Sequence, residues 1–115
     1  MYRIMLADDE GIVIDSLKFI IEKEFGELCE IRYAKTGRSV IELAENFRPD
    51  IAVMDIQMPV MNGYDSTRHI RALERPDIKS MPIIAMSANA FAEDIKLCKE
   101  SGMNEHIAKP IDFGK

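Results

Sequence analysis

Short apolar runs and segments with apolar residues at helical spacing alternate along the chain, and this alternation limits its fold more than any other feature. The runs at residues 3–7, 28–34, 51–54, 82–86 and 105–108 have the length and composition of strands. Neighbouring parallel strands need a crossover connection, and these crossovers are right-handed. The sequence therefore predicts an α/β domain with a doubly wound, five-stranded parallel sheet and helices on both faces.

Four helices are expected to connect or follow these strands. They are residues 12–25, residues 37–47 with Thr36 as N-cap, residues 63–73, and a segment that runs from Phe91 and ends at Gly102. The second shows the clearest apolar stripe, because Val40, Ala44 and Phe47 lie at i, i+4 and i+7. The stripe of the third helix is thinner.

Length, composition and charge restrict the class of protein. The chain of 115 residues is long enough for one domain, and its apolar content of 47% predicts a folded core. No apolar run approaches the roughly 18 residues of a membrane helix, and the start of the chain does not resemble a signal peptide, so we expect a cytoplasmic protein without a membrane segment. The net charge of -5 predicts that this domain does not bind nucleic acid directly. Cys29 and Cys98 match neither a redox pair nor a zinc cluster.

Acidic and hydrogen-bonding side chains follow the predicted strands. In open parallel sheets the ligand site lies at the carboxyl ends of the strands. The residues at these ends are Asp8, Asp9, Asp55, Ser87 and Lys109. Carboxylates that converge on one edge repel each other unless a cation is present, and oxygen ligands without histidine or thiolate select a hard ion. A site with few carboxylates, and with positions left for water and phosphate, suits Mg²⁺ better than Ca²⁺.

Asp55 is the candidate nucleophile at this edge. An aspartate carboxylate can attack a phosphoryl group to form an acyl phosphate, while Mg²⁺ and a lysine balance the charge. The Ser87 hydroxyl and the Lys109 ammonium group would then donate hydrogen bonds to phosphate oxygens. These residues indicate phosphoryl transfer to the protein itself.

The same residues occur in an order that resembles the receiver domain of two-component response regulators. The motifs are Asp8-Asp9, Asp55 followed by Met58-Pro59 and Met61-Asn62-Gly63, then Met86-Ser87-Ala88-Asn89-Ala90, and finally Lys109-Pro110. Each motif is weak alone, but the ordered set spans the chain and is specific. The resemblance implies a flavodoxin-like sheet of order 2-1-3-4-5 in a three-layer α/β/α domain over residues 1–115.

The resemblance also implies a role for each residue that matches a family motif. Asp55 would be the phosphoacceptor. Asp9, Asp55 and the backbone carbonyl of Gln57 would bind Mg²⁺ directly, or Mn²⁺ in its place, and Asp8 would act on the metal through water. Ser87 would move to contact the phosphoryl group.

Three further positions complete the site that the resemblance implies. Lys109 would bridge phosphate and carboxylates, and Pro110 would follow a cis peptide bond. We further expect the amides of Gln57 and Asn89, which flank the site, to set the lifetime of the phosphoryl group.

Partners follow from the resemblance as well. Receivers of this kind take a phosphoryl group from a histidine kinase or a histidine phosphotransfer domain, which docks by the first helix. Their output surface includes the fourth helix, the fifth strand and the fifth helix, and many dimerise through it when phosphorylated. The start of the chain resembles regulators with an effector domain, whereas its end resembles receivers of hybrid sensor kinases, and both architectures stay open.

Two features depart from the family pattern. His106 stands where receivers usually have the switch aromatic Tyr or Phe, and histidine titrates near neutral pH, so it is a candidate switch residue or a partly buried edge residue. The fifth helix is missing or truncated, because the chain stops five residues after Pro110. We therefore expect the native protein to continue beyond Lys115.

Simpler or different readings of these residues remain open. Asp9 and Ser87 could each cap a helix, and Lys109 could be a solvated loop residue. An aspartate-nucleophile phosphatase is the alternative function, but such enzymes use a general acid two residues after the nucleophile, where this chain has Gln57. A flavin carrier would need a phosphate-binding loop after the first strand, where this chain has acids.

Overall fold

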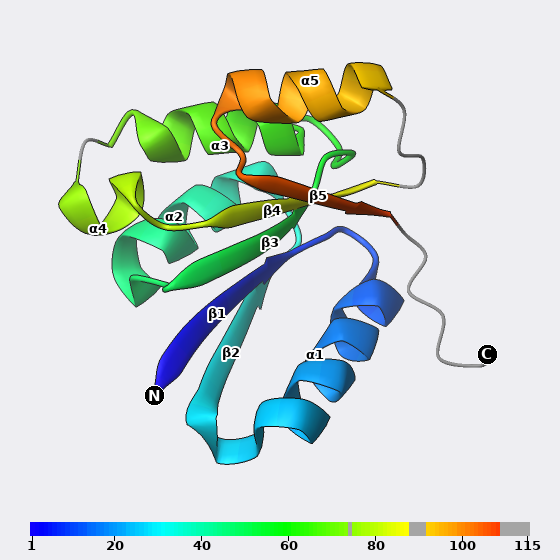
Figure 1. Ribbon diagram of the computed structural model, residues 1–115, viewed down its shortest axis with the longest axis vertical. Helices are drawn as coiled ribbons and strands as arrows, with labels where there is room; N and C mark the ends of the chain where they lie inside the picture. The colour runs from blue at the N-terminus through cyan, green and yellow to red at the C-terminus, as the bar shows by residue number, and fades with distance from the viewer. Residues whose placement is uncertain (74, 88–91, 109–115) are drawn as a thin grey trace.

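The computed structural model describes residues 1–73, 75–87 and 92–108 of the chain (Figure 1). The strands are β1 (Tyr2–Ala7), β2 (Cys29–Ala34), β3 (Ile51–Asp55), β4 (Ile83–Ser87) and β5 (Glu105–Ala108). The helices are α1 (Gly11–Phe25), α2 (Gly37–Phe47), α3 (Gly63–Arg71), α4 (Pro76–Lys79) and α5 (Ala92–Ser101), with a short 3₁₀ helix, η1 (Gly26–Leu28). The alternation of strands and helices expected from the sequence is confirmed.

The five strands form one parallel sheet in the order β2-β1-β3-β4-β5. This is the doubly wound, flavodoxin-like order that the resemblance implied. Asp55 pairs with Met86, and Ser87 pairs with Ala108, so the carboxyl ends of β3, β4 and β5 lie at one edge. Asp8 follows β1 directly and reaches the same edge.

The sheet separates two apolar cores. Among the described helices, α1 covers one face of the sheet, whereas α2, α3 and α5 cover the other (Figure 1). On the α1 face, Ile14 and Leu17 pack in a cluster with Leu6, Val53 and Met86. The second, larger cluster joins the other three helices to the opposite side of the same strands. The three-layer arrangement therefore rests on strands that are apolar on both faces.

Helix α2 forms as its sequence predicts. Thr36 is the N-cap, and its side chain accepts a hydrogen bond from the backbone N–H of Ser39. The expected stripe of Val40, Ala44 and Phe47 is buried against the sheet. This helix ends before Pro49, as expected.

The buried side of helix α3 carries small polar residues, which a search for apolar periodicity does not detect. Ser66 and Thr67 are fully buried on its inner side. Each hydroxyl donates a hydrogen bond to a backbone carbonyl one turn earlier, Ser66 to Asn62 at 2.9 Å and Thr67 to Gly63 at 2.8 Å. Because these hydroxyls are satisfied within the helix, they can face the core at little cost.

Other differences from the sequence-based expectations are small. Strands β3 and β4 each run one residue further than predicted, which places Asp55 and Ser87 inside the hydrogen-bonded sheet. The short helices α4 and η1 were not predicted. The expected start of a fifth covering helix, at residues 111–115, lies outside the described residues. None of the described helices combines the length and apolar character that crossing a bilayer requires.

Candidate functional site

Three carboxylates meet at the carboxyl edge of the sheet. Asp8 follows β1 and is fully buried, Asp55 ends β3 with 2% of its surface exposed, and Asp9 is exposed. One carboxylate oxygen from each residue lies within 4.8 Å of the others. The structure therefore brings together the three acids that the sequence placed at strand ends.

Backbone hydrogen bonds fix the position of Asp8. Its N–H donates to the carbonyl of Ala34, the last residue of β2, at 3.1 Å. Its Oδ1 accepts a hydrogen bond from the N–H of Glu10 at 2.9 Å. The N-cap position of α1 is Glu10, which makes no side-chain capping bond, so the alternative that Asp9 caps this helix is wrong.

Asp55 is oriented by the residues that follow it. Its Oδ1 accepts a hydrogen bond from the N–H of Gln57 at 3.0 Å, and the N–H of Ile56 donates to the carbonyl of Met86 on β4. The loop then closes on itself, because the N–H of Gly63 donates to the carbonyl of Ile56. The carboxylate is thus held where the strand ends and the loop turns.

Gly63 is required by this closure, a role that sequence reasoning missed. A Cβ at this position would lie 2.4 Å from the carbonyl oxygen of Asp55 and 2.8 Å from the Cα of Ile56. Asn62 caps α3 by accepting a hydrogen bond from the N–H of Asp65 at 2.9 Å. Asn-Gly was a visible turn signal, but only the structure shows that the turn abuts the candidate phosphoacceptor.

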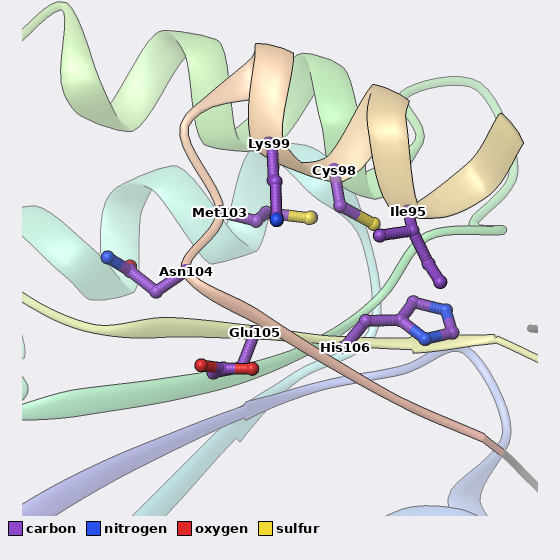
Figure 2. A pocket seen from close by; sticks show the side chains of 7 residues that line it. All are labelled: Ile95, Cys98, Lys99, Met103, Asn104, Glu105 and His106. Atoms are coloured by element: carbon purple, nitrogen blue, oxygen red, sulfur yellow. The ribbon is translucent and has the colours of Figure 1, made fainter. Parts of the chain in front are cut away.

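Ser87 and His106 lie next to each other at the carboxyl end of β4. Ser87 is 2% exposed, and its Oγ is 2.6 Å from Nε2 of His106 on β5. Figure 2 shows the imidazole ring directed toward the carboxyl ends of these strands, beneath Ile95 of α5. Sequence reasoning marked both residues but did not predict that they touch.

The remaining predicted site residues are only partly tested by the structure. Lys109, Pro110 and Asn89 lie outside the described residues. Gln57 is exposed, and its backbone adjoins the acid cluster through the hydrogen bond to Asp55.

The donor set fits a hard divalent cation. All three clustered ligands are carboxylates, and Asp8 and Asp55 are buried, where like charges repel more strongly than in water. Oxygen donors of this kind match Mg²⁺, and Mn²⁺ accepts the same set. The residues present therefore could hold the metal that the family resemblance implied.

Comparison with known proteins places the chain in a family. The model of the response regulator receiver domain matches residues 4–115. The chain is 33% identical over 114 residues to the peroxide stress-activated histidine kinase mak1 of Schizosaccharomyces pombe, covering 96% of this chain but only 7% of that kinase. It is 32% identical to an uncharacterized 14.6 kDa protein of Leptolyngbya boryana, covering 95% of this chain and 79% of that protein.

Comparison with a solved structure supports the same family assignment. The receiver domain of a sensor histidine kinase from Pseudomonas aeruginosa, with a magnesium ion coordinated in its active-site cleft, is 32% identical and superposes with a TM-score of 0.81. The match covers 96% of this chain and 87% of that one. With the strand order, the acid cluster and the family match in agreement, the chain belongs to the receiver domains of two-component response regulators.

Proposed function

We propose that this chain is a phosphoacceptor, which takes a phosphoryl group from a histidine kinase or phosphotransfer domain onto Asp55 in a Mg²⁺-dependent reaction. One observation supports this above all. A buried aspartate at the end of the central strand lies in a cluster of three acids, on a receiver fold. In the transfer, a carboxylate oxygen of Asp55 bonds to phosphorus while the bond from phosphorus to the donor nitrogen breaks.

The chain's own residues prepare this carboxylate. The N–H of Gln57 holds Oδ1 of Asp55 and so fixes the plane of the nucleophile. Asp9, Asp55 and the Gln57 carbonyl are proposed to hold Mg²⁺ directly, and Asp8 through water. When bound, Mg²⁺ supplies positive charge that offsets the charge of the carboxylates and of the transferred group.

Other residues are proposed to stabilise the phosphorylated state. The Ser87 hydroxyl would donate a hydrogen bond to a phosphoryl oxygen, and Lys109 would add a charge-assisted one. Gln57 and Asn89 are proposed to set the lifetime of the acyl phosphate by controlling the approach of water. Decay should change when both amides are replaced.

Whole-protein properties are also proposals, because the chain spans only a small part of the curated kinase it matches. We propose that residues 1–115 form a cytoplasmic receiver domain. Its phosphorylation would control an effector domain or a kinase module, or would cause two copies of the chain to form a homodimer. The chain would catalyse its own phosphorylation and dephosphorylation without turning over a separate metabolite.

A single labelling experiment tests the assignment. Incubation with acetyl phosphate or phosphoramidate and Mg²⁺ should add one phosphoryl group, detected by intact mass and removed by hydroxylamine. Asp55→Asn should abolish the addition, whereas Asp50→Asn, which lies just before the opposite end of the same strand, should retain it. Labelling that persists in Asp55→Asn would contradict the proposal. Steady hydrolysis of a phosphomonoester would favour the phosphatase alternative.

A further inference from the structure

The contact between Ser87 and His106 links the proposed phosphoryl site to a titratable side chain. The register of β4 and β5 places His106 beside Ala85, on the sheet face that carries α5 and two residues before Ser87. This register brings Nε2 of His106 to 2.6 Å from Oγ of Ser87. A Tyr or Phe ring, the usual residue in the family, offers no nitrogen at this point.

The separation of 2.6 Å is that of a hydrogen bond, in which the donor depends on the tautomer of His106. When Nε2 carries no proton, the Ser87 hydroxyl group is the donor and the imidazole nitrogen accepts. A serine hydroxyl has one proton to donate, so a proton given to His106 is not given to a phosphoryl oxygen.

We infer that His106 is a positioning residue whose protonation state decides whether Ser87 can donate its hydroxyl proton to a phosphoryl group on Asp55. This inference rests on the proposed phosphorylation of Asp55. When His106 is protonated, Nε2–H becomes a donor to Ser87 Oγ, and the serine proton becomes available to the phosphoryl oxygen. Neutral His106 with an unprotonated Nε2 competes with the phosphoryl group for that proton.

This competition determines whether phosphorylation of Asp55 raises or lowers the affinity of His106 for a proton. The phosphorylated protein binds a proton on His106 more tightly than the unphosphorylated protein, because it loses a hydrogen bond to neutral imidazole and gains a nearby anion. Phosphorylation and protonation therefore favour each other. Lowering the pH through the titration of His106 should increase the share of molecules in which Ser87 contacts the phosphoryl group.

The surroundings of the His106 ring leave room for the change of hydrogen-bond donor between Ser87 and His106. A cavity of about 190 Å³ lies beside His106, between α5 and β5. Its lining residues are Ile95, Cys98, Lys99, Met103, Asn104, Glu105 and His106 (Figure 2). Figure 2 shows Ile95 of α5 above the ring, and the cavity that both residues line leaves open volume beside it.

Two charged residues, one on α5 and one on β5, are among the residues that line the cavity beside the ring. Lys99 of α5 and Glu105 of β5 are both exposed, and Figure 2 shows Glu105 directed away from the imidazole. Burial raises the pKa of the Cys98 thiol, which stays neutral at physiological pH. On α5, Asp94 accepts a hydrogen bond from a tyrosine of α3. A change in the titration of His106 on phosphorylation therefore reports the phosphoryl group.

Nuclear magnetic resonance of the 115-residue chain with ¹⁵N-labelled histidine tests the inference. The chain has two histidines, and His69, which is exposed on α3, serves as an internal reference. With acetyl phosphate and Mg²⁺ in excess, the midpoint of the His106 titration should rise by about 0.5 to 1 pH unit. The midpoint of His69 should not change. Equal His106 midpoints in samples that intact mass shows to be phosphorylated would overturn the inference.

Variants separate a relay through Ser87 from a direct effect of charge. In Ser87→Ala the upward shift of His106 on phosphorylation should fall by about half or more, since one of its two causes is gone. A full shift in this variant would overturn the role of Ser87. His106→Gln retains hydrogen bonding but does not titrate, so its phosphorylated fraction should vary less between pH 5.5 and 8 than that of the parent chain.

The outcomes distinguish this inference from the proposed function. If Asp55 is not phosphorylated, intact mass shows it directly and the proposed function fails. If Asp55 is phosphorylated but His106→Gln and the parent chain have the same pH profile, the inference alone is wrong.

Discussion

Gly63 lies against the backbone of Asp55 so closely that no other residue fits. A Cβ would lie 2.4 Å from the Asp55 carbonyl oxygen, and backbone atoms cannot yield as a flexible side chain can. We expect Gly63→Ala to lower the free energy of unfolding by about 2 kcal/mol or more. Urea denaturation followed by circular dichroism measures this change.

Gly11 offers a matched control, because it is also the first residue of a helix. A Cβ there would meet only the end of the Lys35 side chain, at 3.4 Å from Nζ. Gly11→Ala should change the free energy of unfolding by less than about 1 kcal/mol. Equal effects of the two substitutions would show that the close approach at Gly63 does not matter.

At the scale of secondary-structure elements, one arginine connects helices α3, α4 and α5 through hydrogen bonds. Arg71, the last residue of α3, donates from Nη1 to the carbonyl of Ile78 in α4 at 2.7 Å. It also donates from Nε and Nη2 to the carbonyl of Gly102, which follows α5, and from Nη2 to Oδ1 of Asn104. The guanidinium group thus fixes the carboxyl end of α5 relative to α3.

Removal of this group should destabilise the domain. Arg71→Ala leaves partly buried carbonyls without their donor, and we expect a loss of about 2 to 3 kcal/mol in the free energy of unfolding. Arg68, one turn earlier, forms an exposed ion pair with Asp65. Arg68→Ala should cost less than about 0.5 kcal/mol. Similar urea midpoints for the two variants would contradict the role of Arg71.

Helices α3 and α5 also meet through titratable groups, which predicts a weakness at alkaline pH. Burial, with Cys98 and Asp94 nearby, raises the pKa of Tyr64, and burial raises the pKa of Cys98. The folded state therefore holds both protons more tightly than the unfolded chain. This contribution to stability is complete below the pKa values of the unfolded chain and is lost as the pH rises through those of the folded state.

The expected result is a falling Tm from about pH 9 upward, since free cysteine and tyrosine titrate near 8.5 and 10. Tyr64→Phe should flatten this dependence, because the phenol no longer titrates. Tyr33→Phe, at an exposed position of β2, should leave it unchanged. Parallel Tm profiles for the parent chain and Tyr64→Phe would show that Tyr64 does not contribute.

Apolar patterning predicted the elements of this fold, but not the contacts that complete its site. The strands could be predicted because both faces of the sheet are buried, and α2 could be predicted because its apolar stripe is continuous. Ser66 and Thr67 face the core as hydroxyls bonded to their own helix, so the apolar stripe that predicted α3 was thin. The contact of Ser87 with His106 depends on the register of β4 and β5, which one sequence does not contain.

At the scale of the whole molecule, the three clustered acids should make stability depend on Mg²⁺. A cation that binds only the folded chain stabilises it by about 1.4 kcal/mol at ten times its Kd. We therefore expect Mg²⁺ to raise the Tm by several degrees. Asp9→Asn removes one exposed ligand of the cluster and should abolish most of this response. Asp15→Asn, at an exposed position on α1, should keep it. A full Mg²⁺ response in Asp9→Asn would argue against a cation at this cluster.

The acids and the serine of the site follow strands rather than helices. Their spacing is set by the hydrogen-bonded register of the sheet. The surfaces of the helices can therefore change without moving the carboxylates at the strand ends. A lineage built on this plan can vary its helix surfaces while the positions of the three acids stay constant.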